Sequence, residues 1–557
     1  MITANIASHL PVMAEKQAET YAVVVQRILG DRLKTVPGHA SYETAYTYKQ
    51  LDEVSDLIAN GLEAYGITKG TRTVLMVKPG LDYFALVFAL FKLEAILVAV
   101  DPGMGIKNLG KCLAEAEPEA FIGIGTAHIA RVLLGWSNNT IHKTILVGNN
   151  PLLAPLVTDL KKIKSLGEQL SGKRNETKAE DVAAILFTSG STGIPKGVVY
   201  THANFTAQVD ALKHLYDIQP GEIDLATFPL FALFAPALGM TSIIPEMDFT
   251  KPGNVDPERI IDAVTQYKCT TMFGSPALLN RVGKCYENKD VKLPTLKRVL
   301  SAGAPVAPTV LQRFKNLLND DVQIFTPYGA TESLPVSSIG SNEVINETAT
   351  LTAEGKGVCV GKLVSGLGVK IIKINDSVIP SWNDNLELSV NEIGEICVKG
   401  PQVTSSYFNR NSATGLAKIR TEDGFYHRMG DTGYLDENSR LWFCGRKSQR
   451  VVMDTETLFT ICCEGIFNTH PFVFRTALVG VTVDGKTTPV ICVEIESEYK
   501  RFNENELKAA LLTLASGSDI TRRIKHVLFH SGFPVDIRHN AKIGREKLAK
   551  WAANQLL

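Results

Sequence analysis

The sequence lacks an excess of charge of either sign. Its 557 residues hold 58 lysines and arginines against 58 aspartates and glutamates, so the formal net charge is zero. A balanced surface argues against broad binding to nucleic acid, which requires a basic face. We therefore expect a small-molecule substrate and no nucleic-acid partner.

Long uncharged apolar runs are also missing. The strongest candidate, Tyr83 to Val100, holds Lys92 and Glu94 near its middle, and charges there are costly in a bilayer. This run predicts a core helix followed by a strand, so no transmembrane segment is expected. Met1 to Glu15 lacks a basic region followed by an apolar one, so we expect no secretory signal.

The nine cysteines lack the spacing of a zinc site. They are scattered singly except for Cys462-Cys463, with no C-x-x-C pair. Reduced thiols fit a reducing compartment, so the expected location is cytoplasmic. No internal repeat is present at periods of about 20 to 50 residues, which argues against a solenoid.

What the chain does have is an alternation of strand-like and helix-like segments. Arg72 to Val77 and Val182 to Phe187 are strand-like and are separated by amphipathic stretches of helix length, the pattern of an α/β layer fold. A chain this long predicts more than one domain. We expect a large N-terminal domain of several subdomains, residues 1–445, with α/β layers and a small β-barrel-like part. A small mobile α+β domain, residues 446–557, would follow. Other strand-like runs are Ile96 to Val100, Lys143 to Val147, Thr270 to Phe273, Lys297 to Leu300 and Gly394 to Val398.

Two further segments carry local expectations. Lys161 to Glu180 is polar and has no strong periodicity, which predicts a surface connector. The tail Arg545 to Leu556 favours a helix within the small domain.

A segment rich in glycine and hydroxyl groups follows the strand-like run that ends at Phe187. Its glycines allow the backbone to approach a polyanion with the amide groups turned inward, and Lys196 adds a positive charge. A flexible Gly/Ser linker is the alternative, but it would not need the stiff Pro195 to Gly197 ending. The spacing also differs from the common P-loop. The segment predicts a phosphate-binding loop made of Thr188, Ser189, Gly190, Ser191, Thr192, Gly193 and Lys196.

Four later segments, taken in order with this loop, resemble the adenylate-forming superfamily, which contains acyl-CoA synthetases, adenylation domains of peptide synthetases and luciferases. The segments are Ser301 to Pro305, Tyr328 to Ser333, His427 to Tyr434 with the adjoining Gly445-Arg446, and His539 to Arg545. The resemblance implies ATP and Mg²⁺ as cofactors. It also implies attack of a carboxylate on the α-phosphate of ATP, which releases pyrophosphate and leaves an acyl adenylate.

The resemblance assigns roles to single residues. Tyr328 would flank the adenine, and Thr331 and Glu332 would face the phosphates, with Glu332 on the metal. Asp431 would accept hydrogen bonds from the ribose hydroxyls, and Arg446 would lie near ribose and phosphate. The other nucleotide-binding positions implied are Gly303, Ala304, Pro305, Gly329 and Ala330.

The catalytic residues implied are Lys542, Thr331 and Glu332, with Lys542 as the adenylation lysine of the small domain. Each feature also has an ordinary structural interpretation. Gly329 and Asp431 could form turns, and a lone lysine near the C-terminus is usually solvated. The joint occurrence of the segments in this order favours the functional interpretation.

Two departures from the superfamily pattern bear on the fate of the adenylate. Gln449 occupies the approximate hinge position, and no glycine follows Gly445 until Gly465. A loop that lets pantetheine pass benefits from glycine, so transfer to a thiol is disfavoured. Ser531 to Arg545 resembles the β-lactone synthetases of bacterial olefin biosynthesis. This resemblance implies a long-chain 2-alkyl-3-hydroxy acid that closes to a β-lactone, and thiolase-like and lactone-decarboxylase-like partner enzymes.

The apolar segment Phe228 to Leu238 predicts one wall of an aliphatic acyl pocket, with plain hydrophobic core as the alternative. The expected pocket residues are Phe231, Phe234, Phe273 and Gly274. The base that removes the hydroxyl proton stays open among His202, His427 and His539.

Two other functions remain open at this point. The first is a fatty acyl-CoA synthetase or fatty acyl-AMP ligase, distinguished by thiol-dependent turnover. The second is a catalytically inactive nucleotide-binding regulator. Retention of the charged positions argues against the regulator; they are Lys196, Glu332, Asp431, Arg446 and Lys542.

Overall fold

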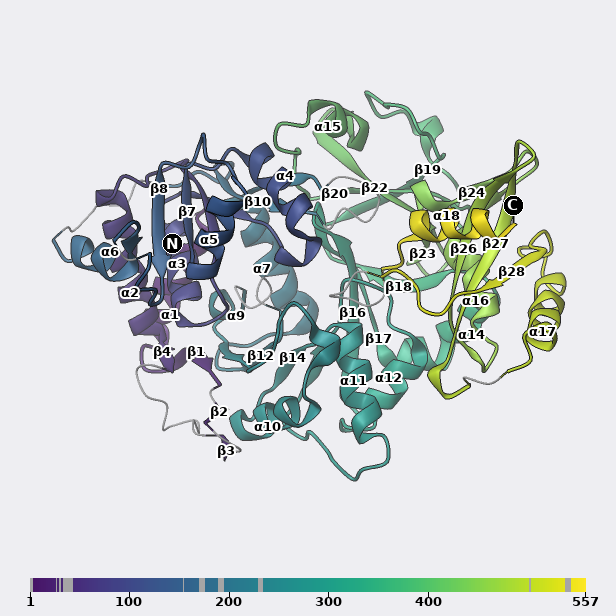
Figure 1. The fold of residues 1–557 in the computed structure, drawn as a ribbon, viewed down its shortest axis with the longest axis horizontal. Helices are drawn as coiled ribbons and strands as arrows, with labels where there is room; N and C mark the ends of the chain where they lie inside the picture. The colour runs from purple at the N-terminus through teal and green to yellow at the C-terminus, as the bar shows by residue number, and fades with distance from the viewer. Residues whose placement is uncertain are drawn as a thin grey trace.

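The structure is a computed structural model of the 557-residue chain. It describes residues 4–26, 28–29, 32–33, 44–153, 155–169, 176–188, 195–228, 234–499, 502–535 and 542–556. Two large sheets and a smaller C-terminal sheet form the framework (Figure 1). Helices and strands are mixed throughout, which confirms the predicted α/β class.

The first sheet has seven strands in the order β11-β10-β6-β5-β7-β8-β9. Every neighbouring pair is parallel except β10 and β11. Its bounds are β5 Arg72–Met76, β6 Ile96–Ala99, β7 Ala120–Ile124, β8 Lys143–Val147, β9 Thr158–Asp159, β10 Val182–Phe187 and β11 Gly197–Thr201. The four strand-like runs expected in this part of the sequence are therefore confirmed.

Helices cover both faces of this sheet. Alternate residues of β7 belong to different cores, with Ile122 packed in the larger cluster and Phe121 in the smaller one. Helices α2 (Tyr48–Ala64), α3 (Leu81–Lys92) and α7 (His202–Tyr216) contribute to the larger cluster. Helices α4 (Ile106–Ala116) and α5 (Gly125–Leu133) lie against the smaller one.

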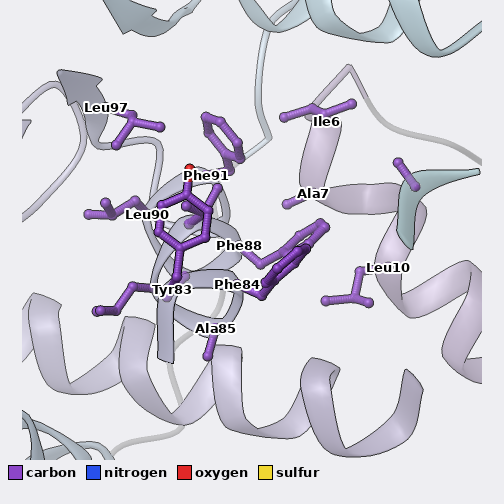
Figure 2. Packing of buried hydrophobic residues seen from close by; sticks show 14 of the residues in the cluster. Ile6, Ala7, Leu10, Tyr83, Phe84, Ala85, Phe88, Leu90, Phe91 and Leu97 are labelled. Carbon is purple, nitrogen blue, oxygen red and sulfur yellow. The ribbon is translucent and has the colours of Figure 1, made fainter. Parts of the chain in front are cut away.

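Helix α3 is the core helix that the apolar run predicts. Residues 83–91 are all buried, and Figure 2 shows Phe84, Phe88 and Phe91 gathered beside Ile6, Ala7 and Leu10 of the N-terminal segment. That segment forms η1 (Ile6–Ser8) and α1 (His9–Lys16). Strand β6 then follows, as expected. None of the helices in the described ranges has the length and apolar character needed to span a membrane.

The second sheet has fourteen strands and two halves that differ in direction. Its path runs β19-β20-β22-β23-β18-β17-β16-β15-β14-β12-β13-β1-β4, with β21 paired to β22. From β13 to β16 the neighbours are parallel, whereas from β16 to β19 they are antiparallel. The antiparallel half is the β-rich part for which a barrel-like form is expected, and its described strands follow an open path.

The elements of this sheet have the following bounds. The strands of the parallel half are β1 Tyr21–Val25, β4 Ala45–Thr47, β12 Ile223–Ala226, β13 Thr241–Ile244, β14 Thr271–Phe273, β15 Arg298–Leu300 and β16 Gln323–Ala330. Those of the antiparallel half are β17 Ser333–Gly340, β18 Val358–Leu363, β19 Gly368–Ile372, β20 Gly394–Lys399, β21 Lys418–Thr421, β22 Gly424–Leu435 and β23 Arg440–Arg446. Helices α10 (Pro257–Tyr267), α11 (Pro276–Tyr286) and α12 (Pro308–Lys315) pack on the parallel half.

The C-terminal part has its own three-stranded sheet, β26-β27-β28, and its own hydrophobic clusters. Its strands are β24 Val451–Val452, β25 Thr457–Leu458, β26 Val473–Val483, β27 Lys486–Ile495 and β28 His526–Phe529. Its helices are α16 Thr460–Phe467, α17 Glu504–Ser516 and α18 Arg545–Leu556, the last at the predicted position. A separate core supports a domain boundary near residue 446, which stays a prediction.

The expected surface connector at Lys161 to Glu180 is wrong in its first part, because α6 (Leu160–Gly167) is a helix. Asp159 caps it by accepting a hydrogen bond from the Lys162 amide at 2.8 Å. The helix packs closely on α2, where a Cβ on Gly167 would lie 2.0 Å from the Leu57 carbonyl oxygen. This partner lies about a hundred residues earlier in the chain, so local periodicity could not reveal it.

Candidate active site

The predicted phosphate-binding loop connects two antiparallel strands. β10 pairs with β11 so that Phe187 faces Gly197, and the two ends of the loop are joined by hydrogen bonds. The Thr188 amide donates to the Lys196 carbonyl at 3.0 Å, and the Lys196 amide donates to Thr188 Oγ1 at 3.2 Å. A strand-to-strand loop differs from the strand-to-helix P-loop, in agreement with the sequence spacing. Ser189, Gly190, Ser191, Thr192 and Gly193 lie outside the described residues.

The predicted adenine and metal segment forms the tip of the β16–β17 hairpin. Ala330 faces Ser333 across the hairpin, which places Thr331 and Glu332 in the turn. Gly329 is required for close approach, since a Cβ there would lie 2.6 Å from the Ser333 carbonyl oxygen. Tyr200 donates a hydrogen bond from its hydroxyl to the Thr331 carbonyl and so ties the tip to β11.

Asp431 is the centre of a buried polar cluster. It lies on β22 opposite Arg446 of β23, and its carboxylate is 2.8 Å from Arg446 Nη1. The Tyr328 hydroxyl donates to its other oxygen at 2.6 Å. Burial raises the pKa of Asp431, and Arg446 and Tyr328 oppose that shift. Three residues predicted from separate sequence segments therefore meet at one point.

Glu332 is held from two sides at the hairpin tip. The Tyr407 hydroxyl donates to Glu332 Oε1 at 2.6 Å. The Thr404 amide donates to the Glu332 main-chain carbonyl at 2.9 Å, and the Thr404 hydroxyl donates to the same oxygen at 3.1 Å. Lys196 lies on the same side, with Nζ 4.3 Å from the centre of the Tyr407 ring. The tip and the phosphate-loop lysine thus share Tyr407, a residue the sequence does not single out.

Lys418 is a second lysine of this cluster that sequence analysis does not identify. Its ammonium donates to the Thr404 carbonyl and lies 4.7 Å from the centre of the Phe425 ring. Burial lowers its pKa to about 7, while Glu332 acts in the opposite direction. Among the described residues no carboxylate lies within ion-pair distance of Lys418. No sequence motif marks Lys418. In the structure it lies opposite His427, a predicted candidate base on β22, and this pairing is what places it at the site.

The three candidate bases differ in placement. His427 is fully buried beside Lys418 and Lys196, and burial with these two charges holds its pKa well below the usual range. His202 lies in the N-terminal core, where its Nδ1 accepts a hydrogen bond from the Ile6 amide and burial lowers its pKa to about 4. His539 lies outside the described residues. The structure therefore brings His427 to the cluster and leaves His202 in the core.

The predicted acyl-pocket residues lie at two places. Phe273 ends β14 and is buried, 5.9 Å from the Phe228 ring, and the Gly274 amide donates to the Leu300 carbonyl at 2.8 Å. Phe234 begins the short helix α9 (Phe234–Ala237) and packs at 6.2 Å from Phe205. A small apolar cavity lies there, lined by Ile6, Val87, Phe88, Phe91, Phe205 and Phe234. Phe231 lies outside the described residues.

The remaining nucleotide positions, Gly303 to Pro305, follow β15 directly. The Ser301 amide donates to the Phe325 carbonyl at 2.9 Å, which continues the pairing of β15 and β16. Gly303 has a φ of +98°, a conformation that favours glycine. This turn and the hairpin tip therefore leave adjacent strands of the same sheet.

Lys542 lies in the C-terminal part, two residues before α18. The loop that ends with it is closed by a bridge between Val535 and Ile543 and by a hydrogen bond from the Gly544 amide to the Pro534 carbonyl at 2.7 Å. Residues 536–541 lie outside the described ranges. The catalytic role of Lys542 stays a prediction.

The hinge-position residue contacts the start of α18. Arg545 Nη1 donates to Gln449 Oε1 at 3.3 Å, and the Arg545 guanidinium pairs with the buried Glu464 at 2.7 Å. Glu464 also accepts a hydrogen bond from the Leu478 amide at 2.8 Å. Burial raises the pKa of Glu464, and Arg545 opposes this shift. The segment after Lys542 is therefore fixed to both the hinge and the core of the small sheet.

Comparison with known proteins identifies the family of the chain. The AMP-binding enzyme family matches residues 15–408, and the chain belongs to that family. The chain is 47% identical over 556 residues to the olefin β-lactone synthetase of Xanthomonas campestris, covering 99% of this chain and 98% of that protein. A protein of the same name from Stenotrophomonas maltophilia is 47% identical with the same coverage.

A solved structure confirms the fold over the whole chain. ATP-bound MatB from Rhodopseudomonas palustris superposes with a TM-score of 0.78, covering 100% of both chains at 18% identity. The arrangement of α/β layers and a C-terminal sheet is thus the fold of that solved structure.

Proposed function

We propose that the protein activates a long-chain 2-alkyl-3-hydroxy acid with ATP and closes it to a β-lactone, with release of AMP and pyrophosphate. The observation that carries this proposal is the 47% identity, along 99% of the chain, to two proteins named olefin β-lactone synthetase. The pairing of Asp431 with Tyr328 and Arg446 supports the nucleotide-binding half of the reaction.

The residues at the cluster fit a nucleotide. The buried Asp431 carboxylate can accept hydrogen bonds from ribose hydroxyls, and the Tyr328 ring offers an aromatic face for a purine. Lys196 and Arg446 supply positive charge for phosphates. Glu332 would hold Mg²⁺, which when bound neutralises charge on the phosphate oxygens.

The first chemical step is a displacement at phosphorus. A carboxylate oxygen of the acid attacks the α-phosphorus of ATP, and the bond to the pyrophosphate oxygen breaks with its electron pair. Negative charge grows on the α-phosphate oxygens during this step. In this proposal Lys542 stabilises that charge, as expected of a preorganised cation.

The second step needs no thiol. The 3-hydroxyl oxygen attacks the acyl carbonyl carbon, its proton passes to a base, and AMP leaves with the electrons of the anhydride bond. An aligned internal nucleophile can reach an effective molarity of about 10⁵ to 10⁸ M, so no second substrate is needed. Cleavage of the high-energy anhydride and departure of AMP offset the strain of the four-membered ring. Of the described candidate bases, His427 lies in the cluster, although its lowered pKa makes it a weak base.

The other candidate enzyme is a fatty acyl-CoA synthetase or fatty acyl-AMP ligase. It would carry out the same first step and then pass the acyl group to a thiol or retain the adenylate. The contact of Gln449 with Arg545, together with the absence of glycine between Gly445 and Gly465, disfavours transfer to a thiol. A catalytically inactive nucleotide-binding regulator would bind ATP without releasing pyrophosphate.

The deciding experiment is mass-spectrometric product analysis with Mg-ATP and a long-chain 2-alkyl-3-hydroxy acid, with and without CoA. Loss of water from the acid without CoA, with AMP and pyrophosphate, is the expected result. A product that forms only with CoA, at the mass of a thioester, would assign the chain to the acyl-CoA synthetases. ATP binding without pyrophosphate would support the regulator.

The proposal extends to the setting of the enzyme. We propose thiolase-like and lactone-decarboxylase-like enzymes of the same pathway as its partners. The nine cysteines are all free in the structure, which supports a reducing, cytoplasmic location.

A further inference from the structure

Helix α5 has an inverted distribution of apolar side chains. All nine of its residues are described, and His128 alone among them is buried. Ile129, Val132 and Leu133 are 41%, 60% and 78% exposed. These positions are spaced i, i+3 and i+4, so they share the outer face of the helix. Because a helix of a globular protein normally turns its apolar stripe inward, the outer face of α5 is suited to being covered.

Three leucines extend this surface. Leu134 follows α5 and is 47% exposed, and Leu152 and Leu156 in the β8–β9 connection are 82% and 79% exposed. The connection is anchored on α5, since the Asn150 side chain lies 2.4 Å from where a Cβ on Gly125 would be. The Leu152 amide donates to Asn150 Oδ1 at 3.1 Å. We define the aliphatic face as Ile129, Val132, Leu133, Leu134, Leu152 and Leu156.

The charge around the aliphatic face has one sign. Residues 120–158 contain no aspartate or glutamate. Helix α4 lies alongside, with Gly110 against the Trp136 ring, and carries exposed Lys107 and Lys111 one turn apart. Arg131 of α5 instead packs inward, with its guanidinium carbon 5.7 Å from the centre of the buried Phe121 ring.

The acidic residues that flank this stretch are already engaged. Glu119, just before it, pairs with Arg72 at 3.2 Å, and Asp159, just after it, caps α6. Apolar side chains bordered by exposed lysines are the composition of an interfacial lipid-binding surface.

We propose that the aliphatic face docks the protein on an anionic lipid surface. Six aliphatic side chains would enter the headgroup boundary while Lys107 and Lys111 face lipid phosphates. A symmetric pair of chains fits less well, because a two-fold contact would place the same cations of each copy against those of the other. This inference stands apart from the proposed reaction, although a lipid surface is also where a long-chain acid would partition.

The test is sedimentation of the full-length protein with vesicles of equal parts phosphatidylglycerol and phosphatidylcholine. We expect binding that weakens with added salt and is lower on phosphatidylcholine alone. The double variant Leu133→Ser/Leu152→Ser should have an affinity for these vesicles at least about tenfold lower, because two apolar side chains no longer enter the lipid. Both replaced side chains are about four-fifths exposed, so thermal stability should not change.

The matched control is Val378→Ser/Val390→Ser, which replaces aliphatic side chains that are 54% and 53% exposed elsewhere on the surface. It should bind vesicles like the parent protein. Equal vesicle binding by the parent and the leucine variant would overturn the proposal. So would light scattering that shows a parent dimer and a monomeric leucine variant, because the face would then join two copies. Pyrophosphate release is measured in the parent and in the leucine variant with a short, water-soluble acid. This assay does not depend on vesicles, so it reports failure of the proposed reaction separately from failure of lipid binding.

Discussion

The two halves of the fourteen-stranded sheet each bury an aspartate, and the two residues have different surroundings. Asp431, in the antiparallel half, has Arg446 at 2.8 Å and the Tyr328 hydroxyl at 2.6 Å. Asp224, on β12 in the parallel half, is buried between β13 and β14, and burial raises its pKa to about 7. The nearby Arg298 pairs with Glu222 instead.

The comparison distinguishes Asp431, which is suited to bind a ligand, from Asp224, whose burial destabilises its charged form. Burial opposes ionisation at both positions. Arg298 favours the charged form of Asp224 but pairs with Glu222, whereas Asp431 has both an arginine in ion-pair contact and a hydroxyl donor. An ionised carboxylate can recognise ribose hydroxyls, whereas a neutral one deep in a parallel sheet contributes little to recognition. We therefore propose that Asp431, and not Asp224, takes part in nucleotide recognition.

The largest expected effect tests whether the positive charge that stabilises the transition state comes from Lys542, which lies outside both halves of the sheet. Lys542→Ala should lower pyrophosphate release by two or more orders of magnitude, about 3 kcal/mol, the size of one lost transition-state contact. The KM for ATP should change little, because the binding groups lie on the sheet. Lys550→Ala, on the exposed side of α18, is the matched control. Unchanged pyrophosphate release by the Lys542 variant would contradict the assigned role.

The next effect tests the recognition assigned to the antiparallel half. Asp431→Ala removes the ribose acceptor and leaves Arg446 without its partner, so the KM for ATP should rise about tenfold or more. Steady-state kinetics at varied ATP, with thermal unfolding to confirm folding, measure it. Asp423→Ala changes an aspartate that is 79% exposed on the β21–β22 turn and should have no effect on KM. Nucleotide affinity that stays the same in the Asp431 variant would refute ribose recognition.

A smaller effect tests whether Lys418 contributes to nucleotide binding at the Asp431 cluster. Its ammonium supports Thr404, which holds the Glu332 carbonyl. Lys418→Met should raise the KM for Mg-ATP about tenfold at most, because its hydrogen bond reaches Glu332 only through Thr404. Lys418→Arg should recover part of this loss. The control is Lys399→Met, because Lys399 also lies over a ring, Tyr426 at 5.7 Å, but pairs with Asp423 at the surface. Equal KM values in the two methionine variants would remove Lys418 from the site.

Much of the fold and of the cluster could be predicted from the sequence. The strand Val182–Phe187 is a continuous apolar run, which predicts a buried strand. The order of the motifs predicts that Tyr328, Asp431 and Arg446 belong to one site, and these residues are in contact. Such features are local in sequence or belong to a shared pattern.

The features that could not be predicted depend on partners distant in the sequence. Helix α6 buries only Leu160, Ile163 and Gly167, and these residues become part of a core only against α2. Tyr407 joins the site because the segment 401–408 crosses the β17 tip and the end of β11. Nothing in the local sequence distinguishes Asp224 from other polar residues in strands. Its raised pKa arises from burial by neighbouring strands, and a single sequence does not show which strands are neighbours.

The smallest effect concerns the stability of the parallel half. An unfolded aspartate has a pKa of about 3.9, so between pH 4 and 7 folded Asp224 retains a proton that the unfolded chain releases. Stability should therefore fall as pH rises through this window and level off above it. Asp224→Asn cannot ionise, so it should be more stable than the parent at pH 8, with the difference shrinking toward pH 4. Thermal midpoints measured across this range test it, with Asp210→Asn at an exposed position as the control. A constant difference at every pH would show that Asp224 is ionised in the folded protein, and the contrast with Asp431 would fail.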